Sequence, residues 1–594
     1  MLHRQWCRAR RRMSSASDHI RDIIGNSRVR DELHDEFNLG RRAIRKLVNM
    51  YCDDDGAQQL VARSSSPEKI VDAFKSFAMM HQSKEVNNDV VALTDLRGPS
   101  QWYPLARSMK RHIVFHCGPT NSGKTHGALV DLEKADCGLY AGPLRLLAWQ
   151  VYKRLQGNAV PCDLRTGQEI IDTPFARHKS ATVEMTDVNS EVEVAVIDEI
   201  QMVGDPDRGH AFTRALLGAP AQTVYLCGDT SATSLIEEIC EINDEQLTII
   251  PHQRLGTLSF SSPVRSLKQL SRGDCLICFS RHSIHEMKKR VERETGLKAC
   301  VVYGSLPPQA RQAQATLFND PDSGFDILIA SDAIGMGLNL HIKRIIFTSL
   351  RKFDGQETRR LTVSEVLQIG GRAGRYGSEF PTGEVTCLEA SANEDDVDFL
   401  REALKSKPTA IEQAGLTPEF SAIQQLSEAI PNLDYHEVIR QFQHHSTLDG
   451  LFFMTAKLQD LIELGEAIQQ LPLTLNQRHT FAMAPVDLRT RSQVKKLISF
   501  ARQFTSHSSV ALDLDPAVEA ILRGTSGRPV PLEDLEELAA VVDIYIWLAY
   551  RFPREFREME YADVVRQQIV QMIHDKLLIS APDKFKRQKH RRRR

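Results

Sequence analysis

Residues 118–125, which read GPTNSGKT, constrain the fold of this chain more than any other segment. They follow the pattern of a phosphate-binding loop, whose fixed positions are filled by Gly118, Gly123, Lys124 and Thr125. An apolar run at 113–117 predicts a strand before the loop, and residues 124–134 predict a helix after it. The segment is therefore expected to join a strand to a helix in an α/β sheet.

The chemistry of this loop suits a nucleoside triphosphate. Its glycines let backbone N–H groups face an anion, and the helix N-terminus adds the positive end of its dipole. Lys124 supplies a point charge for the β- and γ-phosphates, and the Thr125 hydroxyl can ligate magnesium. We therefore predict ATP and Mg²⁺ as cofactors, with ATP held by Gly118, Pro119, Thr120, Asn121, Ser122, Gly123, Lys124 and Thr125.

Two adjacent carboxylates, Asp198 and Glu199, follow an apolar run in the motif DEIQ. Ligands of open α/β sheets bind at the carboxyl ends of strands. There, Asp198 would hold magnesium together with Thr125, and Glu199 would polarise the attacking water as general base. The alternative is a polar strand end without chemistry, which we consider the weaker interpretation. A phosphate loop with an acidic pair still fits kinases, GTPases, transporters and helicases alike.

The segment QIGGRAGRYG at 368–377 presents Arg372 and Arg375 three residues apart, on one face if the segment is helical. An arginine supplied by a second lobe can neutralise charge that builds on a transferred phosphoryl group. Two solvated surface arginines are the alternative. The four glycines of the segment favour a tight approach of its backbone to another part of the molecule.

A chain of 594 residues is too long for one hydrophobic core, because cores stop growing beyond roughly 250 to 300 residues. Between about 101 and 390, short apolar runs alternate with amphipathic stretches, which is typical of parallel crossover units. The predicted fold class is α/β, with two tandem parallel-sheet domains and helical N-terminal and C-terminal regions. Strands are expected at 113–117, 138–141, 192–197, 223–227 and 247–250, and in the second sheet at 275–279, 299–302, 326–330, 344–347 and 384–388.

The change of pattern along the chain also predicts domain boundaries. After 390 the strand signals fade and helical patterns such as 535–552 replace them. The predicted parts are a basic targeting segment (1–17), a helical accessory region (18–100), an ATP-binding domain (101–251), a second sheet domain (252–390), a helical domain (391–523), a C-terminal helical region (524–580) and a basic tail (581–594).

The order of the motifs GPTNSGKT, DEIQ, GDTSA (228–232), ASDAIGMGLNL (330–340) and QIGGRAGR resembles that of superfamily 2 helicases of the DExH type. The fourth residue of the acidic motif is Gln201 rather than histidine, which is a departure within that broad class. WYPLARSMKRHIVFHCGPTNSGKT, YAGPLRLLA, CDLRTGQE, ATVEMTD and DEIQM are more closely similar to the Suv family of mitochondrial RNA-degradosome helicases.

This resemblance implies two RecA-like domains and ATP-dependent unwinding of RNA in the 3′ to 5′ direction. It implies RNA substrates, single-stranded or duplex with an overhang, and an exoribonuclease partner in a degradosome complex. It assigns ATP roles to Lys124, Thr125, Asp198, Glu199, Gln368, Arg372 and Arg375. Gly335 and Gly337 would sense nucleotide and strand together, and Asp229, Thr230 and Ser231 would link hydrolysis to unwinding. The RNA strand would run along Pro143, Arg145, Thr186, Ser280 and Arg281.

Two other functions stay open at this point. A DNA helicase, or a translocase that does not unwind, would grip a sugar-phosphate backbone in the same way. A catalytically dead scaffold would keep the lobes only as a binding surface, but every residue type that hydrolysis needs is present. The formal net charge of −2 gives no global excess of positive charge, so any phosphate-binding surface must be local.

The two ends of the chain carry basic segments. MLHRQWCRARRR is rich in arginine and precedes several serines, as in a transit peptide for the mitochondrial matrix. A disordered basic start is the alternative, and Met13 is a second potential initiator. Eight Lys or Arg lie between 584 and 594, a composition that suits either phosphate-backbone binding or a nuclear address.

The remaining signals are weaker. The longest apolar runs fall short of the ~20 residues of a membrane span, so no integral membrane association is expected. The spacing of Cys275 and Cys278 is that of half a zinc site or a redox pair, but two buried thiols in a strand are the preferred interpretation. Trp102 and Tyr103 suit stacking on a base, or, preferably, packing against the first sheet domain.

Overall fold

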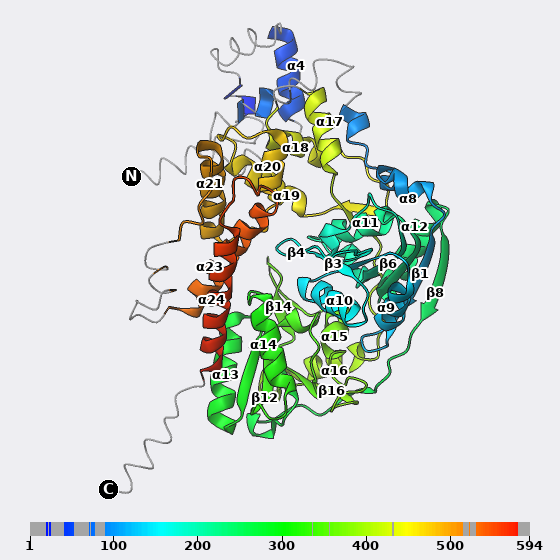
Figure 1. Ribbon diagram of the computed structural model, residues 1–594, viewed down its shortest axis with the longest axis vertical. Coiled ribbons are helices and arrows are strands. Elements are labelled where there is room, and N and C mark those ends of the chain that lie inside the picture. Colours follow the sequence, from blue (N-terminus) through cyan, green and yellow to red (C-terminus); the bar gives the residue numbers. More distant parts are fainter. Residues whose placement is uncertain are drawn as a thin grey trace. The chain divides into compact units, whose positions relative to one another are not determined.

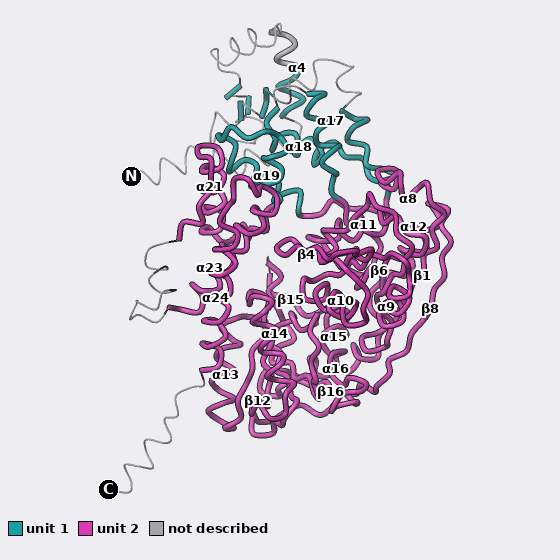
Figure 2. The backbone as a smooth tube through the Cα atoms, viewed as in Figure 1, with its two compact units in different colours: residues 1–97, 417–449, 457–483 teal, residues 98–416, 450–456, 484–594 magenta. Residues whose placement is uncertain are grey.

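The computed structural model describes residues 90–335, 337–355, 357–430, 433–514 and 530–579, helix α4 (Arg41–Cys52), and residues 20–21, 23–24, 70–71, 73–75, 77, 519 and 522. These residues form two compact units, coloured separately in Figure 2. Unit 1 comprises 1–97, 417–449 and 457–483, and unit 2 comprises 98–416, 450–456 and 484–594. The domain boundaries expected from sequence stay predictions.

The first sheet of unit 2 has eight strands, which are β1 (His112–Cys117), β2 (Gly138–Gly142), β3 (Cys162–Arg165), β4 (Ile170–Ile171), β5 (His178–Thr182), β6 (Val192–Asp198), β7 (Ala221–Gly228) and β8 (Gln246–Pro251). Their order is β4-β3-β5-β2-β6-β7-β1-β8, and only the β3–β4 pair is antiparallel. The sheet and its helices, residues 98–251, are called lobe 1 here.

The helices of lobe 1 cover its sheet because apolar residues at helical spacing pack on strands that are buried on both faces. They are α8 (Pro104–Ser108), α9 (Lys124–Lys134), α10 (Arg145–Gly157), α11 (Gly209–Gly218) and α12 (Thr233–Ile242), with 3₁₀ turns at Pro99–Trp102, Val183–Met185, Ile200–Gly204 and Thr230–Ala232. One buried cluster joins Leu132 of α9 and Leu155 of α10 to Val196 of β6. Tyr103 is buried and packs against Gly218 of α11. This agrees with the preferred prediction that Tyr103 packs against the first sheet domain.

The second sheet has six strands, which are β9 (Leu258–Phe260), β10 (Asp274–Ile277), β11 (Lys298–Val302), β12 (Phe325–Ala330), β13 (Arg344–Phe347) and β16 (Gly383–Cys387). All are parallel in the order β11-β12-β10-β13-β16-β9. Around it lie α13 (Arg281–Thr295), α14 (Pro308–Asn319), α15 (Val363–Gly370) and α16 (Glu394–Ala403), with 3₁₀ turns at Leu267–Gln269, Asp332–Gly335 and Glu389–Ser391. Residues 258–403 are called lobe 2.

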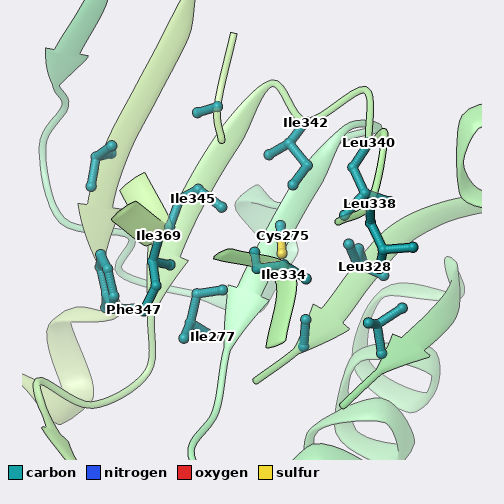
Figure 3. Close-up of a cluster of buried hydrophobic side chains, with 14 of the residues drawn as sticks. Cys275, Ile277, Leu328, Ile334, Leu338, Leu340, Ile342, Ile345, Phe347 and Ile369 are labelled. Carbon is teal, nitrogen blue, oxygen red and sulfur yellow. The ribbon is translucent and has the colours of Figure 1, made fainter. Parts of the chain in front are cut away.

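The core of lobe 2 shows why these runs became central strands. Figure 3 shows Ile277 of β10, Leu328 of β12 and Ile345 of β13 in one cluster, into which Ile369 of α15 packs. Cys275 belongs to this core, and both Cys275 and Cys278 are free, buried thiols whose pKa burial raises. The prediction of two buried thiols is therefore confirmed, although Cys278 lies one residue beyond the end of β10.

The predicted fold class, two successive parallel sheets with helical regions before and after, is confirmed. All ten expected strands are present, with ends shifted by at most two residues. The prediction missed β3, β4, β5 and β9, and the hairpin β14 (Arg351–Phe353) with β15 (Thr358–Arg360). It was also wrong that strands end near 390, because β17 (Ala414–Leu416) pairs in parallel with β18 (Phe452–Met454).

The C-terminal part of unit 2 is helical, as expected. It contains α21 (Arg491–Ser506), α23 (Leu532–Ala549) and α24 (Met559–Leu578), and α24 packs along α14 and β11 (Figure 1). A group of aromatic rings holds α21 to α23, with Phe500 edge-on to Tyr545 at 5.5 Å between ring centroids. The expected helix at 535–552 is α23, shifted toward the N-terminus.

The secondary-structure elements that the structure describes in unit 1 are helices, apart from an isolated bridge between Asp95 and Thr447. Besides α4, unit 1 contains α17 (Phe420–Ala429), α18 (Tyr435–His445), α19 (Lys457–Ala467) and α20 (Leu475–Ala482). Its N-terminal residues share a buried cluster that includes Leu47, Tyr51 and Phe74. The basic targeting segment, the basic tail and residues 523–529 lie outside the described residues. None of the described helices is long and apolar enough to cross a membrane.

Candidate functional site

The register of the first sheet gathers three loops at one edge. Cys117 at the end of β1 pairs with Gly228 at the end of β7, and Asp198 at the end of β6 pairs with Cys227. The phosphate loop, the DEIQ motif and the GDTSA motif therefore leave the sheet side by side. This is the carboxyl edge, where parallel sheets bind ligands.

The phosphate loop has the backbone that its glycines predict. Gly123 adopts φ 79°, a left-handed conformation that glycine takes without strain, and α9 begins at the next residue. The Lys124 ammonium is buried and donates to the carbonyl of Gly118 at 3.3 Å, so the lysine points back over the loop. A Cβ at position 118 would lie 2.5 Å from the carbonyl oxygen of His252, so a side chain has no room there.

The two predicted magnesium ligands lie together. The Thr125 hydroxyl donates to Oδ1 of Asp198 at 3.0 Å, and the Tyr140 hydroxyl donates to Oδ2 at 3.1 Å. Burial and then the charge of Glu199 raise the pKa of Asp198 to about 6, while Lys124 acts in the opposite direction. A hydroxyl and a carboxylate oxygen are donors that Mg²⁺ prefers, so these residues fit the ion. The described residues contain no group of three or more His, Cys, Asp or Glu suited to a metal.

Gln201 links two motifs. Its amide donates to Oε2 of Glu199 at 2.5 Å, and its carbonyl accepts from the backbone N–H of Asp229 at 3.3 Å. Asp229 in turn accepts from the N–H of Ser231 at 2.8 Å. The residue that departs from the broad DExH pattern thus orients the proposed base and connects it to GDTSA.

Lobe 2 contributes a second group of predicted residues. Arg372 donates through Nε to the carbonyl of Gly335 at 3.0 Å, and its Nη2 bonds to the same oxygen. A Cβ on Gly335 would lie 3.4 Å from Gln368. Gly337 has φ 76°, and a Cβ there would lie 2.5 Å from Leu144 of lobe 1. The structure therefore brings Gln368, Gly335 and Arg372 together and sets Gly337 against the other lobe.

The phosphate loop meets the arginine segment across the seam between the lobes. Asn121 donates through Nδ2 to the carbonyl of Gly374 at 3.0 Å, and a Cβ on Gly371 would lie 3.1 Å from Thr120. Burial lowers the pKa of Arg372, and the charges of Glu199 and Asp198 oppose that shift. The guanidinium thus lies within electrostatic reach of both carboxylates.

The segment that carries Arg372 and Arg375 is not helical, so the two arginines do not share a helical face. Helix α15 ends at Gly370, and the chain continues as turns in which Gly374 has φ 68° and Gly377 φ 75°. A Cβ on Gly374 would lie 2.1 Å from the nitrogen of Gly383, so the tight backbone approach inferred from these glycines is present. Burial lowers the pKa of Arg375.

Three of the residues predicted along an RNA strand make contacts within their own lobes. The Pro143 carbonyl accepts from Nη2 of Arg208 at 2.6 Å, and the Thr186 carbonyl accepts from Nη1 of Arg214 at 2.7 Å. Ser280 caps the N-terminus of α13 by accepting from a backbone N–H three residues on.

The two arginines predicted along that strand both pair with helix α23. Nη2 of Arg145 lies 3.2 Å from Oδ2 of Asp543. Arg281 contacts Glu536 at 2.8 Å through Nη1 and Glu533 at 2.9 Å through Nη2. The structure therefore joins Arg145 of lobe 1 and Arg281 of lobe 2 through one C-terminal helix.

Sequence reasoning missed Tyr140 and Arg254, and it noted Gln201 without giving it a role. Tyr140 looks like any aromatic residue in a buried strand. Arg254 lies in the connection between the lobes, where no motif marks it, and its Nη1 donates to the carbonyls of Thr120 at 2.9 Å and Gly371 at 2.8 Å. The only available signal for Gln201 was its position in DEIQ.

Four models of known protein families match segments of this chain, most of them within unit 2. Residues 99–252 match the DEXQ-box helicase domain of Suv3, and 262–377 match the helicase conserved C-terminal domain. Residues 463–505 match the Suv3 C-terminal domain 1, and 532–578 match the C-terminal domain of the ATP-dependent RNA helicase SUV3.

Similar full-length proteins give the same result. DExH16, a mitochondrial DExH-box ATP-dependent RNA helicase of Arabidopsis thaliana, is 43% identical over 83% of this chain and 86% of its own length. The mitochondrial ATP-dependent RNA helicase SUV3 of Oryza sativa subsp. japonica is 44% identical over 80% of this chain and 81% of its own length. The mitochondrial ATP-dependent RNA helicase SUPV3L1 of Homo sapiens is 40% identical over 83% of this chain and 63% of its own length. With its DEIQ motif in a DEXQ-box domain, this chain belongs to the Suv3 family of ATP-dependent RNA helicases.

Proposed function

We propose that this helicase hydrolyses ATP with Mg²⁺, moves 3′ to 5′ along RNA and unwinds duplexes that carry a single-stranded overhang. It works in the mitochondrial matrix and passes single strands to an exoribonuclease for degradation. The word mitochondrial in the names of the relatives supports this location. The direction and the nuclease partner rest on the resemblance of the motifs.

The catalytic roles follow from the side chains at the seam. Lys124 neutralises the β- and γ-phosphates, and Thr125 and Asp198 hold Mg²⁺, which supplies charge at the phosphate oxygens when bound. Glu199, oriented by Gln201, takes a proton from the attacking water. From lobe 2, Gln368, Arg372 and Arg375 complete the site, and Gly335 and Gly337 couple it to the RNA strand, which runs along Pro143, Arg145, Thr186, Ser280 and Arg281.

One observation carries this proposal. The phosphate loop of lobe 1 and the arginine segment of lobe 2 touch through Asn121 and Gly374, with Arg372 in the field of Glu199. A nucleotide bound at Lys124 would therefore face groups from both lobes. Hydrolysis would then be linked to their relative movement, as a motor requires.

Strand displacement tests the proposal directly. RNA duplexes with a 3′ or a 5′ overhang are mixed with the protein, with ATP present or withheld. We expect ATP-dependent displacement from the 3′ overhang only. Displacement from the 5′ overhang alone would show that the protein moves 5′ to 3′ and would contradict the proposed direction. A matched DNA strand that stimulates ATP hydrolysis as strongly as RNA would end the preference for RNA.

A further inference from the structure

The connection between the two lobes, residues 252–257, runs along the phosphate loop. The N–H of His252 donates to the carbonyl of Cys117 at 2.7 Å, and the N–H of Leu255 donates to the carbonyl of Asn121 at 3.0 Å. These bonds anchor the connection before and within the loop. Arg254 lies between them, so its backbone is fixed relative to lobe 1.

The Arg254 guanidinium reaches from the phosphate loop to the arginine segment. Its Nη1 donates to the carbonyls of Thr120 at 2.9 Å and Gly371 at 2.8 Å. Its Nη2 donates to the carbonyl of Gly374 at 3.0 Å and also bonds to that of Ala373. Three of these four carbonyls lie in the turn that carries Arg372 and leads into Arg375.

The electrostatics of this contact are unusual for a structural arginine. Burial lowers the pKa of Arg254 to about 10, and no acidic group among the described residues offsets that shift. A guanidinium stays protonated in proteins, so a cation is buried here against backbone carbonyls alone. Such an arrangement is costly to form, because only hydrogen bonds to carbonyls offset the loss of water around the charge.

The same turn is held by a second donor from the phosphate loop. Asn121 donates to the Gly374 carbonyl that Arg254 also contacts. Asn121 itself has φ 62°, a left-handed conformation that few residues other than glycine adopt. Both donors therefore depend on the shape of the phosphate loop, which ATP would contact.

We propose that Arg254 is a positioning residue for ATP hydrolysis, which holds the turn of Arg372 and Arg375 against the phosphate loop. Its role is to act through the arginines of lobe 2 rather than on the nucleotide or the RNA itself. The inference rests on the proposed function, because it requires those arginines to contribute to hydrolysis. It adds a link between the lobes that no sequence motif marks.

The test compares Arg254→Gln and Arg254→Lys with a control in the same stretch of chain, Arg265→Gln. Arg265 is largely exposed and contacts Glu389 at 3.4 Å. Affinity for a fluorescent ATP analogue, the kcat and KM of RNA-stimulated hydrolysis, and the Tm are measured. Arg254→Gln is expected to lower kcat about 10- to 100-fold while changing nucleotide affinity less than about threefold, because small misplacements of catalytic groups have effects of this size. Arg254→Lys keeps the charge and recovers part of kcat, and Arg265→Gln matches the wild type.

A combined variant separates positioning from general damage. Under single-turnover conditions, adding Arg254→Gln to a protein that already carries Arg372→Ala and Arg375→Ala should not slow hydrolysis further, because both positioned groups are already missing. A further rate loss on adding Arg254→Gln to that background, or a wild-type kcat for Arg254→Gln alone, would overturn the inference. A wild-type protein without RNA-stimulated hydrolysis would instead overturn the proposed function. Should Arg254→Gln fail to fold, the same cycle with Arg254→Lys decides.

Discussion

Arginines at the seam between the lobes and arginines on the predicted RNA path are held in opposite ways. At the seam, Arg254 and Arg372 donate to backbone carbonyls. On the predicted path, Arg145 and Arg281 pair with carboxylates of helix α23. All four belong to unit 2 and lie in or between the same two lobes.

The difference determines whether the charge of each guanidinium group is available to an anionic ligand. A carbonyl fixes a guanidinium without cancelling its charge, so Arg372 would keep its charge for the γ-phosphate, whereas Arg254 uses its charge to hold the turn beside it. A carboxylate occupies the place that a phosphate of RNA would take and neutralises the cation. RNA would therefore have to displace Asp543 and Glu536 before it could use Arg145 and Arg281. The predictions below test the two halves of this comparison, from the largest effect to the smallest.

The largest effect is expected for Arg375→Ala. Removing a guanidinium that offsets charge in the transition state slows hydrolysis about 10³-fold or more, whereas ATP affinity stays close to that of the wild type. RNA-stimulated turnover and binding of an ATP analogue are the measurements. Unchanged turnover would show that lobe 2 does not take part in catalysis.

Glu199→Gln should reduce turnover about 10²- to 10⁴-fold, because the amide cannot accept a proton from water. The variant should still bind ATP, since Lys124, Thr125 and Asp198 are unchanged. Lys124→Ala serves as the converse control, because it should weaken nucleotide binding itself. Equilibrium binding of an ATP analogue, measured beside hydrolysis, distinguishes the two. A Glu199→Gln protein that hydrolyses ATP normally would refute the assignment of the base.

Glu536→Ala should lower stability by about 3 kcal/mol, because three donors lose a buried acceptor. The Glu536 side chain is 3% exposed and accepts from Arg281, Tyr303 and Ser305. Glu533→Ala is the matched control. It removes the other partner of Arg281, but its side chain is 58% exposed, so a loss below about 1 kcal/mol is expected. Urea midpoints compare the two variants, and equal shifts would mean that burial does not decide the strength of these pairs.

The smallest effect is expected for Asp543→Asn, which frees Arg145 for phosphate. RNA affinity should rise about two- to fivefold at low salt, the equivalent of one partly exposed ion pair, and the gain should shrink as salt rises. Asp534→Asn, an exposed change on the same helix, is the control for net charge. An Asp543→Asn protein with wild-type RNA affinity would show that this carboxylate does not compete with RNA.

The sequence predicted those parts of the fold and site in which a run of neighbouring residues carries a chemical motif or an apolar pattern. Helix α9 begins and ends where expected, because the phosphate loop determines its first residue and its apolar face the rest. Strands β3 and β5 were missed because CDLR and HKSAT carry charged residues and lack an apolar run. The pairing of β17 with β18 joins three-residue segments far apart in the chain, which local pattern cannot detect.

The same limit applies to the site. Lys124, Asp198 and Glu199 were predictable because each stands in a motif whose chemistry needs that residue type. Arg254 was not, since its role depends on four carbonyls that approach it only in the folded molecule. The acidic partners of Arg145 and Arg281 lie more than 250 residues away along the chain, so their effect on charge could not be foreseen.

The backbone of Glu199, with φ 57° and ψ 47°, carries one more consequence. A left-handed conformation costs a residue with a Cβ roughly 1 to 2 kcal/mol, which glycine would avoid. Glycine at this position would relieve that cost but would carry no carboxylate. With Glu199 as the proposed base, the chain accepts backbone strain at this position because hydrolysis needs the carboxylate.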